Sequence, residues 1–283
     1  MLTNYKYRTG EAASRCLSEG ILYFAPPAKL NDILEAKFET PPVEDFLDEF
    51  LVAVRELATQ RGFSADSVNL QTHDPALLYE LAEVDHAENV RFKEACQEVG
   101  IFSATVRPDH QALWAYYASD FKGVCFELEW PDEVLETYQI VPVKVQYSAK
   151  HRILNRATDV KELLIKVASS NPTWSMDELM RHTLSEDFRR RIGIASVSRA
   201  VSIKHADWAH EEEIRLISPH PCKVPICDVL KKVFYVRYDS PELELIIGAI
   251  HRHYPNVKLV ELKFSHVPPL VSAREFEVKI VPN

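Results

Sequence analysis

Glycine is scarce in this chain, at 7 of 283 residues, about a third of its average usage. This excludes glycine-rich phosphate loops, collagen repeats and flexible glycine linkers. Long apolar runs are also missing, since no uncharged stretch approaches the roughly 18 residues of a membrane span. The five cysteines are odd in number and widely spaced, and the first residues lack the apolar core of a signal peptide. We therefore expect a cytoplasmic protein that does not enter a membrane.

Basic residues are fewer than acidic residues. The 33 Lys and Arg residues against 42 Asp and Glu give a formal charge of −9. The chain as a whole therefore has no electrostatic attraction to nucleic acid or to an anionic membrane. With 46% hydrophobic residues, a chain of this length can bury on the order of 70–75% of its unfolded surface without disulfides or a structural metal.

The order of patterns predicts an α+β fold. Apolar residues recur at helical spacing after residue 42 and again after Asp74-Pro75, and Ser175 and Glu178 have the spacing of a capping box. Strand-like segments flank these helical blocks, the last at 275–281. We expect one α+β domain over 1–283, with a mixed or antiparallel central sheet and two helical insertions at 41–100 and 159–200.

The segment 207–217 is rich in acidic residues. If it is a strand, Glu211, Glu213 and Arg215 share one face. Because carboxylates are rare in strands, this face is expected to line solvent or a polar cleft. The plainer interpretation is an exposed strand with a Glu213–Arg215 pair. We expect Glu213 to contribute little to folding.

Two further polar positions precede that segment. Arg8 follows Tyr7 on the first predicted strand, and Ser103 and Thr105 point to one face of a later strand. The chain order is thus Arg, Ser-x-Thr, Glu-x-Glu. This order resembles the strand motifs of the arginine, serine-x-serine and glutamate-x-glutamate class of ADP-ribosyltransferases.

That resemblance implies NAD as co-substrate. Arg8, with Tyr7 beside it, would bind the NAD phosphate or ribose, while Ser103 and Thr105 would brace the site. Glu213 would be catalytic and Glu211 would assist a protein or nucleic-acid acceptor. The chemistry is coherent, because a carboxylate near the ribose stabilises the oxocarbenium-like cation that forms when nicotinamide leaves.

A second resemblance covers nearly the whole chain. Its signatures include Leu30-Asn31-Asp32 with Glu35, Leu113-Trp114-x-x-Tyr117, and Lys204 followed by Trp208-x-x-Glu211-x-Glu213-x-Arg215. These look like the bacterial family known as domain of unknown function 2971. The resemblance implies a bacterial or phage-derived intracellular protein, often associated with defence or abortive-infection loci, without an established common reaction.

Two motifs allow other interpretations. Asn31, Asp32 and Glu35 could join Glu211 and Glu213 as Mg²⁺ ligands of a nuclease, although Asp32 is more simply a cap for a short helix. Trp114 and Tyr117 could stack a base or ring, or belong to the core. The His and Cys residues match no compact zinc spacing, so no metal is expected.

The leading hypothesis is therefore an intracellular bacterial defence or toxin-type effector that splits NAD, as an ADP-ribosyltransferase or NAD glycohydrolase. A metal-dependent nuclease and a non-catalytic sensor or binding module are the alternatives. The expected partner is a nucleotide or NAD-like small molecule. The sequence identifies no partner protein or antitoxin.

Overall fold

The computed structural model describes residues 1–32, 34–60, 62, 75–149, 153–183, 185–236, 240–263 and 279–280. Its residues group into two compact units. Unit 1 comprises Met1–Leu30, Glu98–Tyr147 and Lys204–Asn283, and unit 2 comprises Asn31–Gln97 and Ser148–Ile203. Unit 2 contains most of both helical insertions expected from the sequence. That the chain folds as one domain stays a prediction.

Unit 1 is built on an eight-stranded sheet. Strands β10 and β11 are parallel, while the other neighbouring strands are antiparallel, so the sheet is mixed. The α+β class with a mixed central sheet is thereby confirmed. In spatial order the strands are β12 (Lys279–Ile280), β11 (Lys258–Leu262), β10 (Leu230–Val236), β4 (Val124–Trp130), β1 (Leu2–Arg8), β3 (Gly100–Thr105), β8 (Glu213–Ser218) and β5 (Val141–Lys144).

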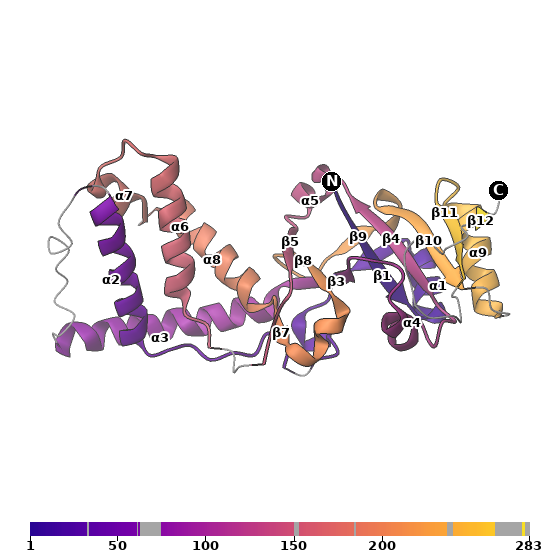
Figure 1. Cartoon of the computed structure of the whole chain (residues 1–283), viewed down its shortest axis with the longest axis horizontal. Coiled ribbons are helices and arrows are strands. Elements are labelled where there is room, and N and C mark those ends of the chain that lie inside the picture. The colour runs from indigo at the N-terminus through magenta and orange to yellow at the C-terminus, as the bar shows by residue number, and fades with distance from the viewer. Residues whose placement is uncertain are drawn as a thin grey trace. The chain divides into compact units, whose positions relative to one another are not determined.

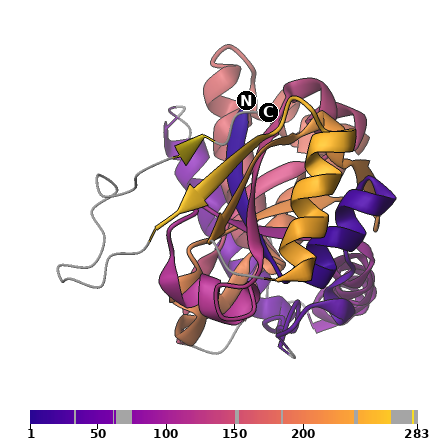
Figure 2. The ribbon, with the colours of Figure 1, turned by 90° about the vertical axis from the view of Figure 1, so that its right-hand side faces the viewer.

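Helices cover both faces of this sheet. The helices α1 (Gly10–Glu19) and α9 (Pro241–His253) contact each other on one face, as Figure 2 shows. Their apolar residues share a core with Phe126 and Leu128 of β4. Helix α4 (Gln111–Tyr117) packs through Trp114 against Tyr7 and Cys125, whose side chains point away from that core. The sheet therefore has a separate apolar cluster on each side.

Shorter helices and strands connect these layers (Figure 1). Four of the short strands form two further two-stranded sheets, β2 with β9 and β6 with β7. The bounds of these shorter helices and strands are β2 (Ile21–Tyr23), η1 (Pro27–Lys29), α5 (Asp132–Thr137), β6 (Gln146–Ser148), β7 (Ile203–His205), η3 (Ala206–Glu211), β9 (Lys223–Pro225) and η4 (Ile226–Asp228).

Local sequence determines where several helices begin and end. The Thr9 hydroxyl accepts a hydrogen bond from the Ala12 amide and caps α1, which stops at Gly20 in the left-handed region at φ 69°. The capping box expected from the sequence is present: the Glu178 carboxylate accepts from the Ser175 amide at 2.7 Å, and the Ser175 hydroxyl accepts from the Glu178 amide at 3.3 Å. It begins helix α7.

Unit 2 is helical. Its core joins four of its helices through residues such as Leu57, Leu164, Leu179 and Phe188. The helices are α2 (Val43–Gln60), α3 (Pro75–Glu98, whose last residue belongs to unit 1), α6 (Arg156–Ser170), α7 (Met176–Thr183) and α8 (Glu186–Ala200). The strand expected at 275–281 lies largely outside the described residues, and β12 falls within it.

Candidate functional site

Strand pairing brings four of the predicted site residues to one face of the sheet in unit 1. Ser103 lies opposite Arg215 and Thr105 opposite Glu213 in the antiparallel pair of β3 and β8. Directly paired residues point to the same face. The structure therefore places the Ser-x-Thr and Glu-x-Arg side chains in a single row.

Glu211 does not belong to that strand, contrary to the expected alternation. It is the last residue of the short helix η3, and Glu212 follows in the left-handed region at φ 47° before β8 begins at Glu213. This turn changes the direction of the chain between the two glutamates. The hydroxyl of Thr105 donates to the carbonyl oxygen of Glu211 at 2.8 Å and so fixes the turn against β3.

The two glutamates share a buried network with two cations. Lys204 Nζ donates to Glu211 Oε2 at 2.5 Å and to Glu213 Oε2 at 3.2 Å. Arg215 Nε donates to Glu213 Oε1 at 2.9 Å. The exposed fractions of these four residues are only 3% for Lys204, 6% for Glu211, 3% for Glu213 and 0% for Arg215. The Glu213–Arg215 pair exists as expected, but the exposed-face interpretation is wrong because the pair is buried.

The network is closed by two tyrosines. The Tyr117 hydroxyl donates to Glu211 Oε1, and the Tyr147 hydroxyl accepts a hydrogen bond from the Glu213 amide at 2.8 Å. Tyr117, Tyr147 and Ser103 are only partly buried, unlike the two carboxylates.

Glu213 is ionised at neutral pH. Burial by itself raises the pKa of this carboxyl, but the charges of Arg215 and Lys204 and the hydrogen bonds from Arg215 and Ser103 outweigh burial and lower the pKa to about 2. The row of polar side chains therefore includes a fixed negative charge, which is paired with Arg215 and Lys204.

Lys6 links β1 to this network. Its Nζ donates to the Ser103 carbonyl oxygen and lies 5.2 Å from the centre of the Phe102 ring. Burial and the charge of Arg8 lower the pKa of Lys6 to about 7, although Glu213 and Glu211 oppose that shift. Sequence reasoning gave Lys6 no role, and its only signal was a lysine within a strand between two tyrosines.

Arg8 lies two residues further along β1, on the same face as Lys6. Beyond the bridge between Tyr5 and Thr105, no further pairing joins β1 to β3 among the described residues, so Arg8 lies where the two strands are no longer paired. The Arg8 Nε is buried without a hydrogen-bond partner, and no ion pair reaches its guanidinium within the described part of the chain. Burial lowers its pKa, while the nearby Cys16 opposes the shift.

Tyr7 and Trp114, two predicted cofactor ligands, are held within the core. The Tyr7 hydroxyl donates to the Arg107 carbonyl oxygen at 3.1 Å, and its ring meets the Trp114 ring edge-on at 5.4 Å between centroids. The Trp114 side chain is fully buried and its Nε1 donates to the Pro108 carbonyl oxygen at 2.7 Å. These contacts match the core interpretation of Trp114, whereas Tyr117 on the same helix reaches the charged network.

The remaining candidates, Asn31, Asp32 and Glu35, lie in unit 2. Asp32 Oδ1 accepts from the Leu34 amide at 2.9 Å, and the Glu35 amide donates to the Asp32 carbonyl oxygen at 3.0 Å. This is the geometry of a turn capped by Asp32. Within the described residues, no three His, Cys, Asp or Glu side chains are placed to hold a metal ion. Nor does any described helix have the length and apolar character to cross a membrane.

Comparison with known proteins identifies one family. Residues 113–216 match the family described as "Protein of unknown function (DUF2971)". No curated protein and no solved structure matches the chain. The matched segment contains Tyr117, Lys204 and the Glu211-x-Glu213-x-Arg215 motif, the centre of the buried network. Over residues 113–216 the chain is therefore similar to the protein family of unknown function DUF2971.

Proposed function

We propose that unit 1 binds an NAD-like dinucleotide and splits it, acting as an ADP-ribosyltransferase or NAD glycohydrolase. The observation that carries the proposal is the Arg8 side chain, which is partly buried and whose buried Nε has no hydrogen-bond partner among the described residues. A buried donor left unpaired is costly to the fold unless an anion accepts from it in the working state. A pyrophosphate suits it, since the planar guanidinium donates two parallel hydrogen bonds to phosphate oxygens.

Lys6 connects this phosphate ligand to the carboxylates. It interacts electrostatically with Arg8 on one side and with Glu213 and Glu211 on the other. Tyr5 pairs with Thr105, so Lys6 and Arg8 leave β1 on the face of the sheet opposite to that of Glu213. A dinucleotide bound through its pyrophosphate at Arg8 and Lys6 would therefore pass between β1 and β3, beyond their last paired residues, to bring its nicotinamide ribose towards Glu213. An anion would also favour the protonated form of Lys6, whose pKa is lowered to about 7 without it.

In the proposed reaction the bond between ribose C1′ and the nicotinamide nitrogen breaks, and nicotinamide leaves with the electron pair. The ionised Glu213 stabilises the positive charge that develops on the ribose. Water, or a nucleophile of the acceptor, then forms the new bond to C1′ and gives its proton to Glu211. The products are nicotinamide and either ADP-ribose or an ADP-ribosylated acceptor.

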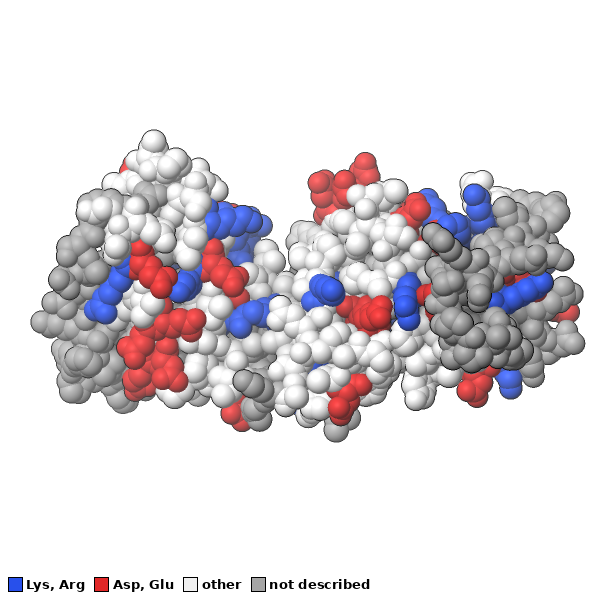
Figure 3. All heavy atoms as spheres, in the orientation of Figure 1, with Lys and Arg blue, Asp and Glu red and all other residues white. Residues whose placement is uncertain are grey.

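The proposal extends to a cellular role as a bacterial intracellular defence or toxin-type effector, which the family resemblance suggests. The acceptor would be a protein or a nucleic acid. Acidic and basic side chains lie among one another on the face shown in Figure 3, so this face gives no electrostatic preference for a polyanion.

A second candidate function, a binding module without catalysis, is favoured by the burial of Glu213. Its side chain is 3% exposed and is paired with both Arg215 and Lys204. A carboxylate neutralised in this way could simply hold β8 and η3 together beneath a nucleotide site. This candidate predicts binding of NAD without turnover.

The test is to incubate the full chain with NAD and to measure released nicotinamide by chromatography. We expect release by the wild type and none by Arg8→Met, with EDTA having no effect. Binding without release would support the binding module instead. Nucleic-acid cleavage that EDTA abolishes, with NAD left intact, would support the nuclease and overturn the proposal.

A further inference from the structure

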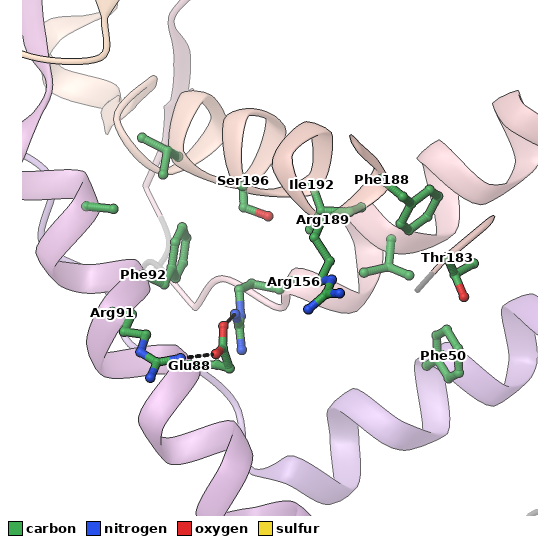
Figure 4. A pocket seen from close by; sticks show the side chains of 14 residues that line it. Phe50, Glu88, Arg91, Phe92, Arg156, Thr183, Phe188, Arg189, Ile192 and Ser196 are labelled. Carbon is green, nitrogen blue, oxygen red and sulfur yellow. Dashed lines mark hydrogen bonds and ion pairs between the residues drawn. The ribbon is translucent and has the colours of Figure 1, made fainter. Parts of the chain in front are cut away.

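Unit 2 contains a cavity of about 410 Å³, and none of the residues of the proposed NAD site lines it. Figure 4 shows it between helices, with Phe92 and Phe188 on opposite sides and Phe50 at one end. Pockets that hold small molecules usually have volumes of about 300–1,000 Å³. This cavity is therefore large enough for one ring system with an attached group.

Its lining combines aromatic rings with positive charge. Among the described residues, Arg91, Arg156 and Arg189 line the cavity together with one acid, Glu88. In Figure 4 the side chains of Arg156 and Arg189 extend into the same space. The cavity is thus locally basic in a chain whose formal charge is −9.

Part of this lining is held in place by the protein itself. Arg156 lies 5.7 Å from the centre of the Phe92 ring and 4.0 Å from Glu88, which also pairs with Arg91 at 2.7 Å. Phe92 and Phe188 are 6% and 3% exposed. A guanidinium oriented on an aromatic ring is already arranged to receive both a planar group and an anion.

The opposite wall is equally fixed. The Ser196 hydroxyl donates to Asp159 Oδ2 at 2.7 Å, and Arg199 binds the same carboxylate through two nitrogens at 2.8 Å. These bonds tie α8 to α6 beside the cavity. Little reorganisation would be needed for a ligand to enter, which favours binding.

We infer that this cavity is a binding site for a small organic anion with a planar ring, of the class and size of a nucleoside monophosphate. The phosphate or carboxylate pairs with the guanidinium groups, and the ring packs against the phenylalanines. A dinucleotide is too large for a cavity of this volume. The inference does not rest on the proposed NAD reaction, because the site lies wholly in unit 2.

Gly193 offers a way to close the cavity without disturbing the fold. It lines the cavity within α8, and a Cβ built on it meets no atom within 4 Å. Gly193→Leu would fill the space and should also favour the helix, since glycine lowers helix stability. Gly248 on α9 is equally unobstructed and lies in unit 1, so Gly248→Leu is the matched control.

The experiment is calorimetric titration of the full chain carrying Arg8→Met, which removes the proposed phosphate ligand of unit 1. The probes are adenosine 5′-monophosphate, adenosine, inorganic phosphate and 1-naphthoate. We expect the monophosphate or the naphthoate to bind at least about tenfold more tightly than adenosine or phosphate alone, because ring and anion act together. Which of these two anions binds distinguishes a phosphate from a carboxylate ligand.

Gly193→Leu should weaken that binding by about tenfold or more, and Gly248→Leu should leave it unchanged. Arg189→Gln should weaken it, whereas Arg190→Gln should not, since Arg190 pairs with Asp187 and does not line the cavity. Binding of neither anion, or binding that Gly193→Leu leaves intact, would overturn the inference. If the chain binds the anion but releases no nicotinamide from NAD, the proposed NAD reaction of unit 1 fails and the inferred anion site of unit 2 stands.

Discussion

Arg215 donates a hydrogen bond from its Nε to Oε1 of Glu213 at 2.9 Å, between two side chains that are 0% and 3% exposed. The pair lies within one strand at a separation of two residues. A charge pair this deeply buried contributes little net stability when intact, but removing one partner leaves the other charge uncompensated.

Glu213→Gln is therefore expected to destabilise the protein by about 3–5 kcal/mol, the usual cost of breaking a buried ion pair. The measurement is urea unfolding at pH 7. Glu11→Gln is the control, since Glu11 forms an exposed pair with Arg15 and its loss should change stability little. If Glu213→Gln has the same free energy of unfolding as the wild type, Glu213 contributes little to folding, as expected from the sequence.

The lowered pKa of Lys6 makes the free energy of unfolding depend on pH. Burial and Arg8 lower its pKa from 10.5 to about 7 in the folded protein, so the unfolded chain binds more protons between these values. The contribution of Lys6 therefore makes the folded state more stable as pH rises from 7 towards 10.5. Between pH 7 and 9, the free energy of unfolding of the wild type should rise relative to that of Lys6→Met. Parallel curves for the two proteins would contradict the burial of Lys6.

Gly123 allows the close approach that positions Arg8. A Cβ at this position would lie 2.1 Å from the Arg8 carbonyl oxygen and 3.0 Å from Cα of Ala118, both backbone atoms. Gly123→Ala should cost about 1–3 kcal/mol, as overpacking does elsewhere. Gly193→Ala, where a Cβ meets nothing, should instead gain up to about 1 kcal/mol in the helix. Thermal unfolding of both variants checks the contrast, and equal melting temperatures would refute it.

Arg8 should be a residue whose removal helps the fold. Its Nε is buried without a partner among the described residues, and relieving an unpaired buried polar group is worth about 1–3 kcal/mol. Arg8→Met should raise the free energy of unfolding, whereas Arg15→Met on the exposed face of α1 should not. A loss of stability in Arg8→Met would mean that the guanidinium is already satisfied by the folded protein.

Local patterns in the sequence predicted those features that depend on neighbouring residues. The capping box of Ser175 and Glu178 and the shared face of Ser103 and Thr105 follow from spacing alone. The order of strand-like and helical segments also predicted a mixed or antiparallel sheet, and the parallel pair of β10 and β11 makes it mixed.

The burial of the site could not be predicted in this way. Alternation shows that Glu213 and Arg215 share a face, but whether that face is covered depends on α4, which contacts Glu211 through Tyr117 from 94 residues away in the chain. It also depends on the turn at Glu212, which sets the direction of η3. Glu211 was misplaced because the left-handed turn at Glu212 has no glycine to mark it. Lys6 was missed because its contacts with Ser103 and Phe102 span almost one hundred residues.

The central claim, that Arg8 is the phosphate ligand of an NAD site, is tested most directly by titrating the full chain with NAD in a calorimeter. We expect the wild type and Arg15→Met to bind NAD alike, and Arg8→Met to bind at least about tenfold more weakly because a charge-assisted contact is lost. A wild type that does not bind NAD, or an Arg8→Met variant that binds it as tightly as the wild type, would contradict the claim.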